Sequence, residues 1–336
     1  MDFCQDLNNI VFSISSLSLF CLFAMTIDFD DFVYRKVVNR MSVKGILKNI
    51  YLFIMDWGIF NWMPDKVFLK LFYKAATGKK LNIDNPQTFN EKIQWMKLYD
   101  RKPIYVQLAD KYEVRKYVES KIGNSYLIPL IAHWNTCSEI IFSELPSQFV
   151  LKCTHDSGGL VICKDKSRFN KVDTVKKLNK CLKRNFYHVS REWAYKDIKP
   201  RVICEQYLSE DNGDDVKDYK FFCFNGEPKM VQVDFDRYTN HGRNIYTANW
   251  EFINLSIKCP NNPKKIIPKP VNYDDMLQVA RTLSEGFPFV RIDLYSINGK
   301  TYFGEFTFYH GSGIEEFNPS HYELEFGNWI QLNKKV

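Results

Sequence analysis

Two carboxylates in the C-terminal part of the chain, Asp293 and Glu305, have the type and spacing of ligands for a divalent cation. They lie in two stretches rich in β-branched and aromatic residues, Val290 to Ile297 and Lys300 to Phe308, on either side of Asn298-Gly299. This pattern predicts a β-hairpin with a two-residue turn, in which both carboxylates lie roughly level and can face one side of the sheet. Mg²⁺ prefers oxygen ligands, commonly one or two carboxylates together with substrate phosphates. Two solvated strand carboxylates are the alternative.

A lysine and a small loop upstream have the composition of a phosphate-binding site. The apolar segment Phe149 to Cys153 contains Lys152 and leads into a loop with Ser157, Gly158 and Gly159. Glycines let backbone N–H groups approach anionic oxygens, and a lysine supplies a compact positive charge. The sequence therefore predicts that this loop binds the phosphates of a nucleotide, with a plain hairpin turn as the alternative.

A single acid, Glu205, interrupts the short apolar segment Val202 to Leu208. A carboxylate that becomes buried in such a segment needs a hydrogen-bonding or charged partner. Two interpretations stay open at this point. Glu205 belongs to a functional site, or it lies at the exposed end of an edge strand.

Taken in order along the chain, these segments resemble the ATP-grasp superfamily, and specifically its TupA-like branch, which is associated with bacterial surface-polysaccharide and teichuronopeptide synthesis. The resemblance extends over most of the chain and includes four further segments: Asn85 to Trp95, Ala109 to Arg115, Leu145 to Lys152 and Gly311 to Gly313. It implies an α+β fold in which two subdomains close on ATP, with Mg²⁺ between the phosphates and acidic residues. The implied reaction activates a carboxylate as an acylphosphate, which an amine or a related nucleophile then attacks.

The resemblance also implies a role for each matching residue. The nucleotide would be held by Lys111, Lys152, Ser157, Gly158, Gly159, Glu205, Tyr207 and Leu208. The lysines and the glycine loop would contact phosphates, and the segment that starts at Glu205 would read the adenine edge. Asp293 and Glu305 would bind metal, and Arg291, on the same strand face as Asp293, would steady the acylphosphate. Lys111 and Lys152 would also screen the charge that develops during phosphoryl transfer.

Two positions depart from the pattern of the superfamily. Thr307 stands two residues after Glu305, where many members have an Asn, and a hydroxyl is a poorer metal ligand. We expect the second metal to be held less tightly there, or the site to be completed by phosphate and water oxygens. Asp156 stands in the phosphate loop, where Gly is expected. We expect its carboxylate to point away from the phosphates or to meet Lys164 or Lys166.

Four other residues have weaker support from the sequence. Lys220 precedes a strand expected from Phe221 to Phe224, which is followed by a turn expected at Asn225-Gly226, and it would point toward the ATP cleft or mark an exposed strand end. Arg237 is a candidate for binding a substrate carboxylate or phosphate, although exposed arginines are common. His155 is a candidate phosphate contact and His310 a candidate for the acceptor pocket. A single histidine is more often a hydrogen-bonded structural residue.

Helical periodicity predicts several helices around these motifs. Thr88 to Leu98 begins with a capping-box pattern formed by Thr88 and Glu91. Further helices are expected at Lys102 to Ser120, Val172 to Asn185 and Tyr273 to Glu285. We expect three parts in the chain: a hydrophobic and amphipathic helical extension (1–80), the N-terminal and lid subdomains of the ATP-grasp fold (81–207), and a C-terminal metal-binding subdomain (208–336).

The extension lies outside the resemblance. Asn8 to Ile27 carries no charge, and a bilayer core needs about 20 residues. Basic residues follow this stretch rather than precede it, so the positive-inside rule would leave the catalytic domain in the cytoplasm. Alternatively, the stretch is a loosely ordered extension read from an upstream start codon, and Met25 or Met41 is the initiator residue that is used. Lys44 to Lys80 has the pattern of two amphipathic helices, broken near Pro64, which would pack on their own domain or lie on a membrane surface.

Composition agrees with an enzyme. The 336 residues can form two lobes, and 27 Phe, 19 Tyr and 7 Trp can supply their cores. The net charge of +7 suits an anionic substrate or a membrane surface, and no nucleic-acid-binding motif occurs. Nine cysteines without C-x-x-C pairs or zinc-like spacing favour a reducing cytoplasm.

We therefore predict an ATP- and Mg²⁺-dependent carboxylate–amine ligase, acting in the cytoplasm on a glycan or sugar-nucleotide precursor of a capsule, an O-antigen or teichuronopeptide. The alternative is a glycosyltransferase that uses a nucleotide-sugar, with Asp234-Phe235-Asp236 as a metal-binding D-x-D motif. That alternative leaves Lys152, the glycine loop and the hairpin acids unexplained. A nucleotide-binding subunit without activity is a third reading. The sequence names neither the carboxylate nor its acceptor, nor the oligomeric state.

Overall fold

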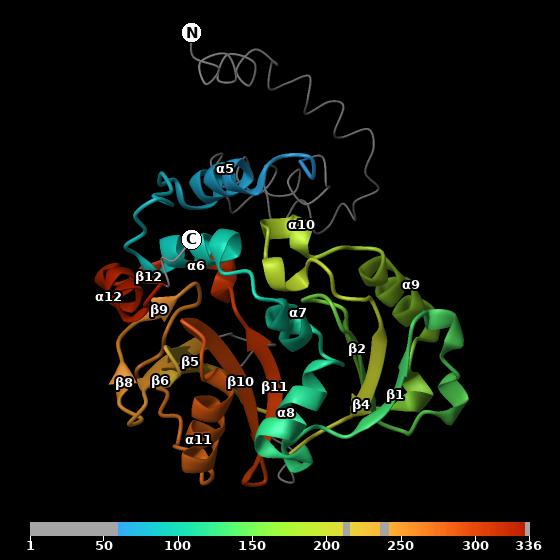
Figure 1. Cartoon of the computed structure of the whole chain (residues 1–336). Coiled ribbons are helices and arrows are strands. Elements are labelled where there is room, and N and C mark those ends of the chain that lie inside the picture. The colour runs from blue at the N-terminus through green and yellow to red at the C-terminus, as the bar shows by residue number, and fades with distance from the viewer. Residues whose placement is uncertain (1–59, 211–215, 236–241, 333–336) are drawn as a thin grey trace, which may run out of the picture. The chain divides into compact units, whose positions relative to one another are not determined.

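The structure is a computed structural model that describes residues 60–210, 216–235 and 242–332. Two antiparallel sheets dominate these residues, one at the left and one at the right of Figure 1. The right-hand sheet has four strands in the order β1-β4-β2-β3, and the left-hand sheet has six in the order β11-β10-β5-β6-β7-β8. Helices accompany both sheets, which confirms the predicted α+β fold.

The elements have the following bounds. The helices are α5 (Asp65–Thr77), α6 (Phe89–Tyr99), α7 (Pro103–Ala109), α8 (Val114–Ile122), α9 (Lys171–Leu182), α10 (Tyr187–Ser190), α11 (Tyr273–Ser284) and α12 (His321–Trp329), with 3₁₀ turns that include η2 (Cys137–Glu139) and η6 (His310–Gly313). The strands are β1 (Leu130–Trp134), β2 (Phe149–Cys153), β3 (Leu160–Cys163), β4 (Val202–Gln206), β5 (Asp218–Phe224), β6 (Glu227–Phe235), β7 (Gly242–Thr247), β8 (Phe252–Ile253), β9 (Ser256–Ile257), β10 (Phe289–Ile297), β11 (Lys300–Thr307) and β12 (Phe317–Asn318).

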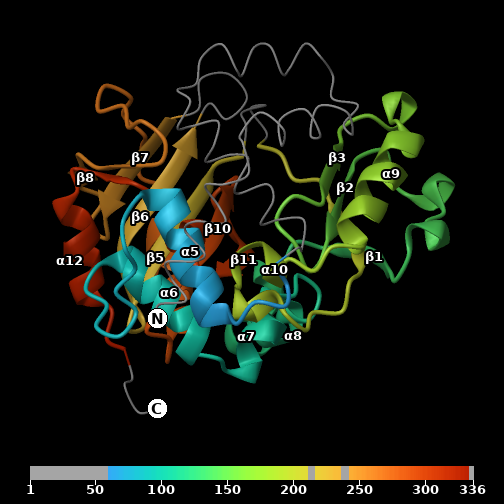
Figure 2. The same ribbon diagram turned by 90° about the horizontal axis from the view of Figure 1, so that it is seen from above.

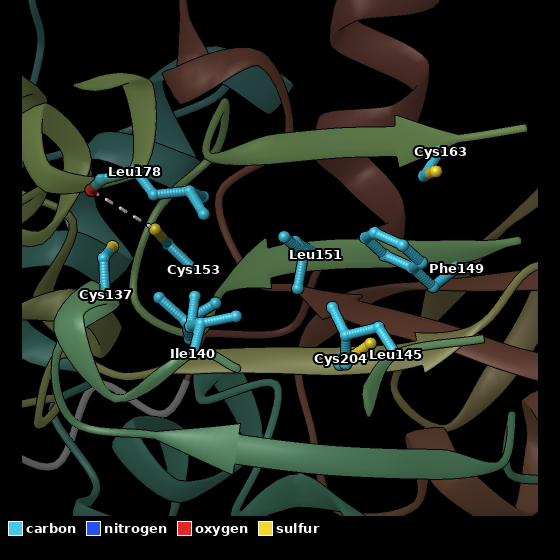
Figure 3. Packing of buried hydrophobic residues seen from close by; sticks show 10 residues of the cluster. Cys137, Ile140, Leu145, Phe149, Leu151, Cys153, Cys163, Leu178 and Cys204 are labelled. Carbon is cyan, nitrogen blue, oxygen red and sulfur yellow. Dashed lines mark hydrogen bonds between the residues drawn. The ribbon is translucent and has the colours of Figure 1, made fainter. Parts of the chain in front are cut away.

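The four-stranded sheet has one buried face, and α9 lies beside β2 in both views (Figures 1 and 2). Side chains alternate along β2, so Phe149, Leu151 and Cys153 enter the core while Val150 and Lys152 face the other side. Figure 3 shows this core. The alternation therefore places Lys152 on the face that is free for a ligand.

The six-stranded sheet is buried more completely. The inner strands β5 and β10 pair with each other and with β6 and β11, respectively, and all seven residues of β5 are buried. Phe89 of α6 packs on one side of this sheet, with its ring centroid 4.9 Å from that of Phe289. The helix begins at Thr88 with the expected capping box, in which the Thr88 hydroxyl accepts from the Glu91 N–H and the Glu91 carboxylate accepts from the Thr88 N–H.

The hairpin predictions are confirmed. Asn298 and Gly299 have φ angles of 51° and 75°, and Asn225 and Gly226 have 51° and 83°. Positive φ at both central residues is the requirement of the two-residue turn that Asn-Gly favours. The turns join β10 to β11 and β5 to β6 as expected.

The single helix expected from Lys102 to Ser120 is wrong, because the chain breaks into α7 and α8 at Asp110. The Asp110 carboxylate accepts from the N–H groups of Tyr112 (2.8 Å) and Glu113 (3.3 Å). An aspartate that binds nearby backbone N–H groups competes with the helical hydrogen bonds. The break gives Lys111 an irregular backbone between two helices.

The uncharged stretch Asn8 to Ile27 and the first amphipathic helix lie outside the described residues. The second amphipathic helix is α5, which follows Pro64 and buries five residues: Phe68, Leu69, Phe72, Tyr73 and Ala76. It therefore packs on its own domain through this face. Within the described residues, no helix has the length and apolar character needed to cross a membrane.

Candidate active site

A cavity of about 550 Å³ lies between the two sheets. The four-stranded side contributes Val150, Lys152, Leu160, Ile162, Lys164 and Glu205 to Leu208, and the other side contributes Val216, Lys217, Asp234, Phe235, Lys265 to Pro268, Tyr295 and Ile297. Four of the predicted nucleotide residues, Lys152, Glu205, Tyr207 and Leu208, are therefore gathered in one place. Its aliphatic walls, with lysines and carboxylates among them, have the chemistry of a pocket for a planar base with attached phosphates.

Glu205 is neither exposed nor on an edge strand, because β4 pairs with both β1 and β2. Its side chain is 8% exposed and accepts from Lys152 Nζ (2.7 Å) and from Arg115 Nη1 (3.2 Å). The buried acid thus has two cationic partners, as burial requires. Arg115 was not predicted as a site residue, although it is the last residue of Ala109 to Arg115, one of the segments on which the family resemblance rests.

The segment after Glu205 forms one wall of the cavity. β4 ends at Gln206, whose N–H donates to the Pro129 carbonyl (3.0 Å), and Tyr207 and Leu208 line the cavity beyond it. Lys164 Nζ lies 5.9 Å from the centroid of the Tyr207 ring. Backbone groups past the end of a strand are open to a ligand, so this segment has the geometry expected for contacting the edge of a base.

The loop between β2 and β3 places Ser157 and Gly158 at the surface. Gly158 has a φ of 145°, which L side chains rarely adopt. Lys111 holds the loop from below, since its Nζ donates to the Asp156 carbonyl (2.7 Å) and its N–H donates to the Thr154 carbonyl (3.1 Å). The structure therefore brings Lys111 to the loop, as expected.

Asp156 does not meet Lys164 or Lys166. Its carboxylate is buried and accepts from the Gly159 N–H (3.2 Å), while Lys166 donates to the carbonyls of Ser143 and Leu145. Of the two expected arrangements, the ion pair is thus wrong. His155 is likewise turned into the protein, where its Nε2 lies 3.1 Å from the Cys181 carbonyl oxygen.

The two hairpin acids face each other directly, with Asp293 paired to Glu305 across β10 and β11. The hairpin turn alone would pair Asp293 with Gly304, but a bulge next to Asp293 absorbs one residue of β11. A Cβ on Gly304 would lie 2.9 Å from the Asp293 carbonyl oxygen. Glycine at this position therefore permits the bulge that brings the two carboxylates level.

Positive charges surround Asp293. Arg291 donates to both of its carboxylate oxygens (2.6 and 2.7 Å), and Lys220 donates to Oδ2 (2.8 Å). Lys220 also contacts Asp218, which the sequence did not single out as a site residue. Asp218 lies two residues before Lys220, on the same face of a strand, and that spacing is a usable signal. Burial would lower the pKa of Lys220, but Asp218 and Asp293 hold it above its ordinary value.

Glu305 differs from Asp293 in its accessibility, because 39% of its side chain is exposed. Burial acts to raise its pKa, but Lys111, Arg291 and Lys220 outweigh that effect and lower it. The Thr307 hydroxyl accepts from Arg291 (3.0 Å) and donates to Glu305 (3.3 Å). Glu305 is thus an ionised, reachable carboxylate with the Thr307 oxygen beside it.

His310 and Arg237 complete the predicted set. His310 Nδ1 lies 2.8 Å from Arg291 Nη1 and its Nε2 lies 3.1 Å from Glu315, so it supports Arg291 from behind. Arg237 lies outside the described residues, as does Asp236. The Asp234 carboxylate is engaged by Arg243 at 2.7 Å.

Comparison with known proteins decides the family. A family model described as TupA-like ATPgrasp matches residues 91–331. The chain belongs to the TupA-like ATP-grasp family. This confirms the predicted family and fold, and it favours the ligase over the glycosyltransferase. No curated protein matches the chain.

Several solved structures are similar to this TupA-like chain. D-alanine–D-alanine ligase from Helicobacter pylori has a TM-score of 0.39 and 13% identity, over 73% of this chain and 69% of that one. The same enzyme from Bacillus anthracis, complexed with ATP, has a TM-score of 0.35 and 14% identity, over 60% and 53%. Phosphoribosylamine–glycine ligase from Thermotoga maritima has a TM-score of 0.34 and 13% identity, over 61% and 48%. The chain thus spans about half to two thirds of the length of these proteins.

Family membership supports ATP-dependent carboxylate–amine ligation as the general class of activity. Enzymes of the ATP-grasp fold use ATP and Mg²⁺, so the predicted cofactors are confirmed at the level of the family.

Proposed function

We propose that this TupA-like protein activates a carboxylate with ATP and Mg²⁺ and joins it to an amine or a related nucleophile on a glycan or sugar-nucleotide precursor of a bacterial surface polysaccharide. The family supports the ligase class, and the polysaccharide context rests on the resemblance to the TupA-like branch. The observation that carries the proposal is the pairing of Asp293 with Glu305, with Arg291 and Lys220 in contact, on the same strand β10 whose Tyr295 and Ile297 line a base-sized cavity. We place the reaction in the cytoplasm, where ATP is available.

The cavity fits the nucleotide by its chemistry. In the proposed arrangement the adenine lies among aliphatic side chains that include Val150 and Ile162, and its edge meets the backbone after Gln206. Lys152, Lys111 and the Ser157–Gly159 loop then hold the phosphates. Lys152 can reach toward phosphate without leaving Glu205 as an isolated buried charge, because Arg115 stays paired with Glu205.

The hairpin fits a divalent metal. Glu305 offers an accessible carboxylate, and among the described residues Asp293 Oδ1 accepts one hydrogen bond, from Arg291 Nε, which leaves it a lone pair. Asp293, Glu305 and the Thr307 hydroxyl are the proposed metal-binding residues. A bound Mg²⁺ would neutralise part of the phosphate charge.

The chain's own residues would orient the carboxylate substrate. Arg291 is held by Asp293, Thr307 and His310, so its guanidinium presents a fixed positive charge beside the metal residues. A preorganised cation stabilises the charge that develops on the transferring phosphoryl group without reorganisation. Lys220 keeps its proton, since its pKa is raised, and adds a second cation. Arg237 is proposed as a further contact for a substrate carboxylate or phosphate.

Nucleotide binding tests the first half of the proposal. ATP and a set of UDP-sugars would be titrated into the full chain with Mg²⁺, using Lys152→Ala and Glu305→Gln and, as matched controls on exposed helix positions, Lys70→Ala and Glu119→Gln. We expect ATP to bind and both site variants to weaken it at least tenfold, with the controls unchanged. Binding of a UDP-sugar alone, lost in Asp236→Ala, would instead establish the glycosyltransferase.

Carboxylate activation tests the second half. Hydroxylamine takes the place of the unknown amine and converts an acylphosphate into a stable hydroxamate, so uronic acids and amino acids can be screened without the acceptor. We expect the wild type to form both ADP and hydroxamate from at least one of these carboxylate substrates. The Glu305→Gln variant should form neither. ATP binding without hydroxamate from any uronic acid or amino acid would contradict the proposed substrate class.

A further inference from the structure

A second cluster of metal-binding side chains lies beneath the phosphate loop, apart from the hairpin acids. Cys153 ends β2, Asp156 lies in the loop and Cys181 lies in the last turn of α9. The two sulfurs and one carboxylate oxygen all lie within 4.8 Å of one another. Cys153 and Asp156 are buried, and Cys181 is partly exposed. The end of β2, the loop that follows it and the later helix α9 therefore converge on one point.

The loop is shaped around this point. The Gly159 N–H donates to Asp156 Oδ1 (3.2 Å), which orients the carboxylate toward the cysteines. A Cβ on Gly159 would lie 2.7 Å from Cys153 Cβ and 2.8 Å from both Cys153 Sγ and Asp156 Oδ1. Only a glycine leaves room for the cluster. These contacts also account for Asp156 in a phosphate loop, because its side chain serves the inner face and not the nucleotide.

We propose that Cys153, Asp156 and Cys181 bind one Zn²⁺ ion. Zinc takes thiolate and carboxylate ligands in a tetrahedral arrangement, and ligands three positions apart, as Cys153 and Asp156 are, have the spacing of the first half of many zinc sites. Two sulfur ligands select a softer metal than the Mg²⁺ proposed at the hairpin. The two sites are therefore distinguished by their chemistry.

Cys137 of η2 belongs to the same buried cluster as Cys153, but its sulfur is not among the ligand atoms that lie within 4.8 Å of one another, and the Cys153 sulfur faces the carbonyl of Leu178 in α9, 3.9 Å away (Figure 3). We assign the fourth position of the tetrahedron to a water molecule, which can enter beside the partly exposed Cys181. A thiol loses its proton when it binds the metal, so one dication replaces two protons and the charge beneath the phosphates does not change.

The metal would join the phosphate loop to β2 and α9. A ligand that binds only the folded state increases the free energy of unfolding. The increase grows with the logarithm of the ratio between the ligand concentration and its Kd. Zinc would therefore stabilise the four-stranded side of the protein whether or not ATP is present. This site does not depend on the proposed ligase activity.

The test is a metal titration of the full chain, purified with a reductant and stripped of metal by a chelator. We expect one equivalent of Co²⁺ to bind with a thiolate-to-metal charge-transfer band in the near ultraviolet, Zn²⁺ to displace it, and excess Mg²⁺ to leave the band unchanged. Loss of a residue that only hydrogen-bonds a metal ligand lowers metal affinity by roughly 10- to 100-fold. Cys181→Ser and Asp156→Asn each remove a proposed ligand, so they should weaken Zn²⁺ binding by more than that. Cys259→Ser removes an equally accessible cysteine elsewhere and should change nothing.

Circular dichroism and thermal melting of each variant without metal show whether it is folded, so lost binding is read only from folded variants. Asp156→Asn preserves shape and serves where Cys181→Ser does not fold. The proposal fails if Zn²⁺ binds the wild type no more tightly than it binds these variants. It also fails if Cys153 and Cys181 form a disulfide in the purified chain and no charge-transfer band appears after reduction.

Discussion

At the residue scale, the candidate site consists of opposite charges that are paired before any ligand arrives. Arg291 lies between Asp293 and Glu305, and Lys220 lies between Asp293 and Asp218. Removing one member of a buried ion pair leaves an uncompensated charge in a medium of low polarity. Substitutions in this network should therefore affect stability as well as ligand binding, and the two effects must be measured separately.

Lys220→Met is the clearest case. It leaves Asp218 and Asp293 without the cation between them, and breaking a buried pair typically costs about 3–5 kcal/mol. We expect the free energy of unfolding in urea to fall by about that amount. Lys264→Met, at an exposed position, should have no measurable effect. An unchanged unfolding midpoint for Lys220→Met would show that the acids are solvated.

His310 predicts a dependence of stability on pH. Burial lowers its pKa to about 4 from 6.5, in spite of the neighbouring Glu315. Between those values the unfolded chain binds a proton that the folded chain does not, so the free energy of unfolding decreases as the pH falls from 6.5 to 4. The full effect is about 3 kcal/mol. We would measure the free energy of unfolding in urea at several pH values in this range. It should change less steeply with pH for His310→Gln than for the wild type, by the equivalent of about one proton. Equal dependence on pH in the two proteins would contradict the assignment.

At the element scale, local signals were sufficient where one short segment decides the structure. Asn-Gly turns and the Thr88/Glu91 capping box are such signals, and the hairpins and α6 follow from them. The break at Asp110 needed a side-chain hydrogen bond that competes with the helix, which periodicity does not reveal. The neighbours of β4, the partners of Glu205 and the Cys153–Cys181 approach depend on tertiary pairing between distant segments. They could not be read from local sequence.

The bulge at Gly304 gives a prediction at this scale. In Gly304→Ala the new Cβ would meet the Asp293 carbonyl at 2.9 Å, so β10 and β11 must move apart or change register. We expect a loss of about 1–3 kcal/mol in unfolding free energy. We also expect ATP binding to weaken at least tenfold in the presence of Mg²⁺ and much less in its absence, because the carboxylates no longer oppose each other. Equal losses with and without Mg²⁺ would indicate general destabilisation instead.

At the scale of the whole molecule, the site is a joint product of the two sheets. Lys152 and the glycine loop come from the four-stranded sheet, β1 to β4 within residues 130–206, and the hairpin acids come from the six-stranded sheet. The subdomain boundary expected at residue 207 remains a prediction. Helix α6 precedes the four-stranded sheet in the chain, yet it contacts α12 and η6, which follow the strands of the six-stranded sheet. Neither sheet alone carries the complete set of residues proposed to bind the nucleotide and the metal.

The two walls of the cavity can be tested independently. Leu160 belongs to β3 and is 43% exposed, and Ile266 lies in the segment opposite and is 88% exposed, yet both line the cavity. Side chains so exposed contribute little to folding, so Leu160→Ala and Ile266→Ala should leave the unfolding midpoint nearly unchanged. Covering a large aliphatic side chain completely is worth about 1.5–3 kcal/mol. We therefore expect each variant to weaken ATP binding by at most about 10- to 100-fold.

Ile141→Ala is the matched control, since Ile141 is 55% exposed and does not line the cavity. If only Leu160→Ala weakens ATP binding, the nucleotide contacts the four-stranded sheet and does not reach the opposite wall. If both do, the effects of the double variant decide between independent contacts and a shared one. If the contacts are independent, the losses in binding free energy of the two single variants add up in the double variant. If both walls must contact the same base together, either single substitution already causes most of the loss, and the double variant loses little more.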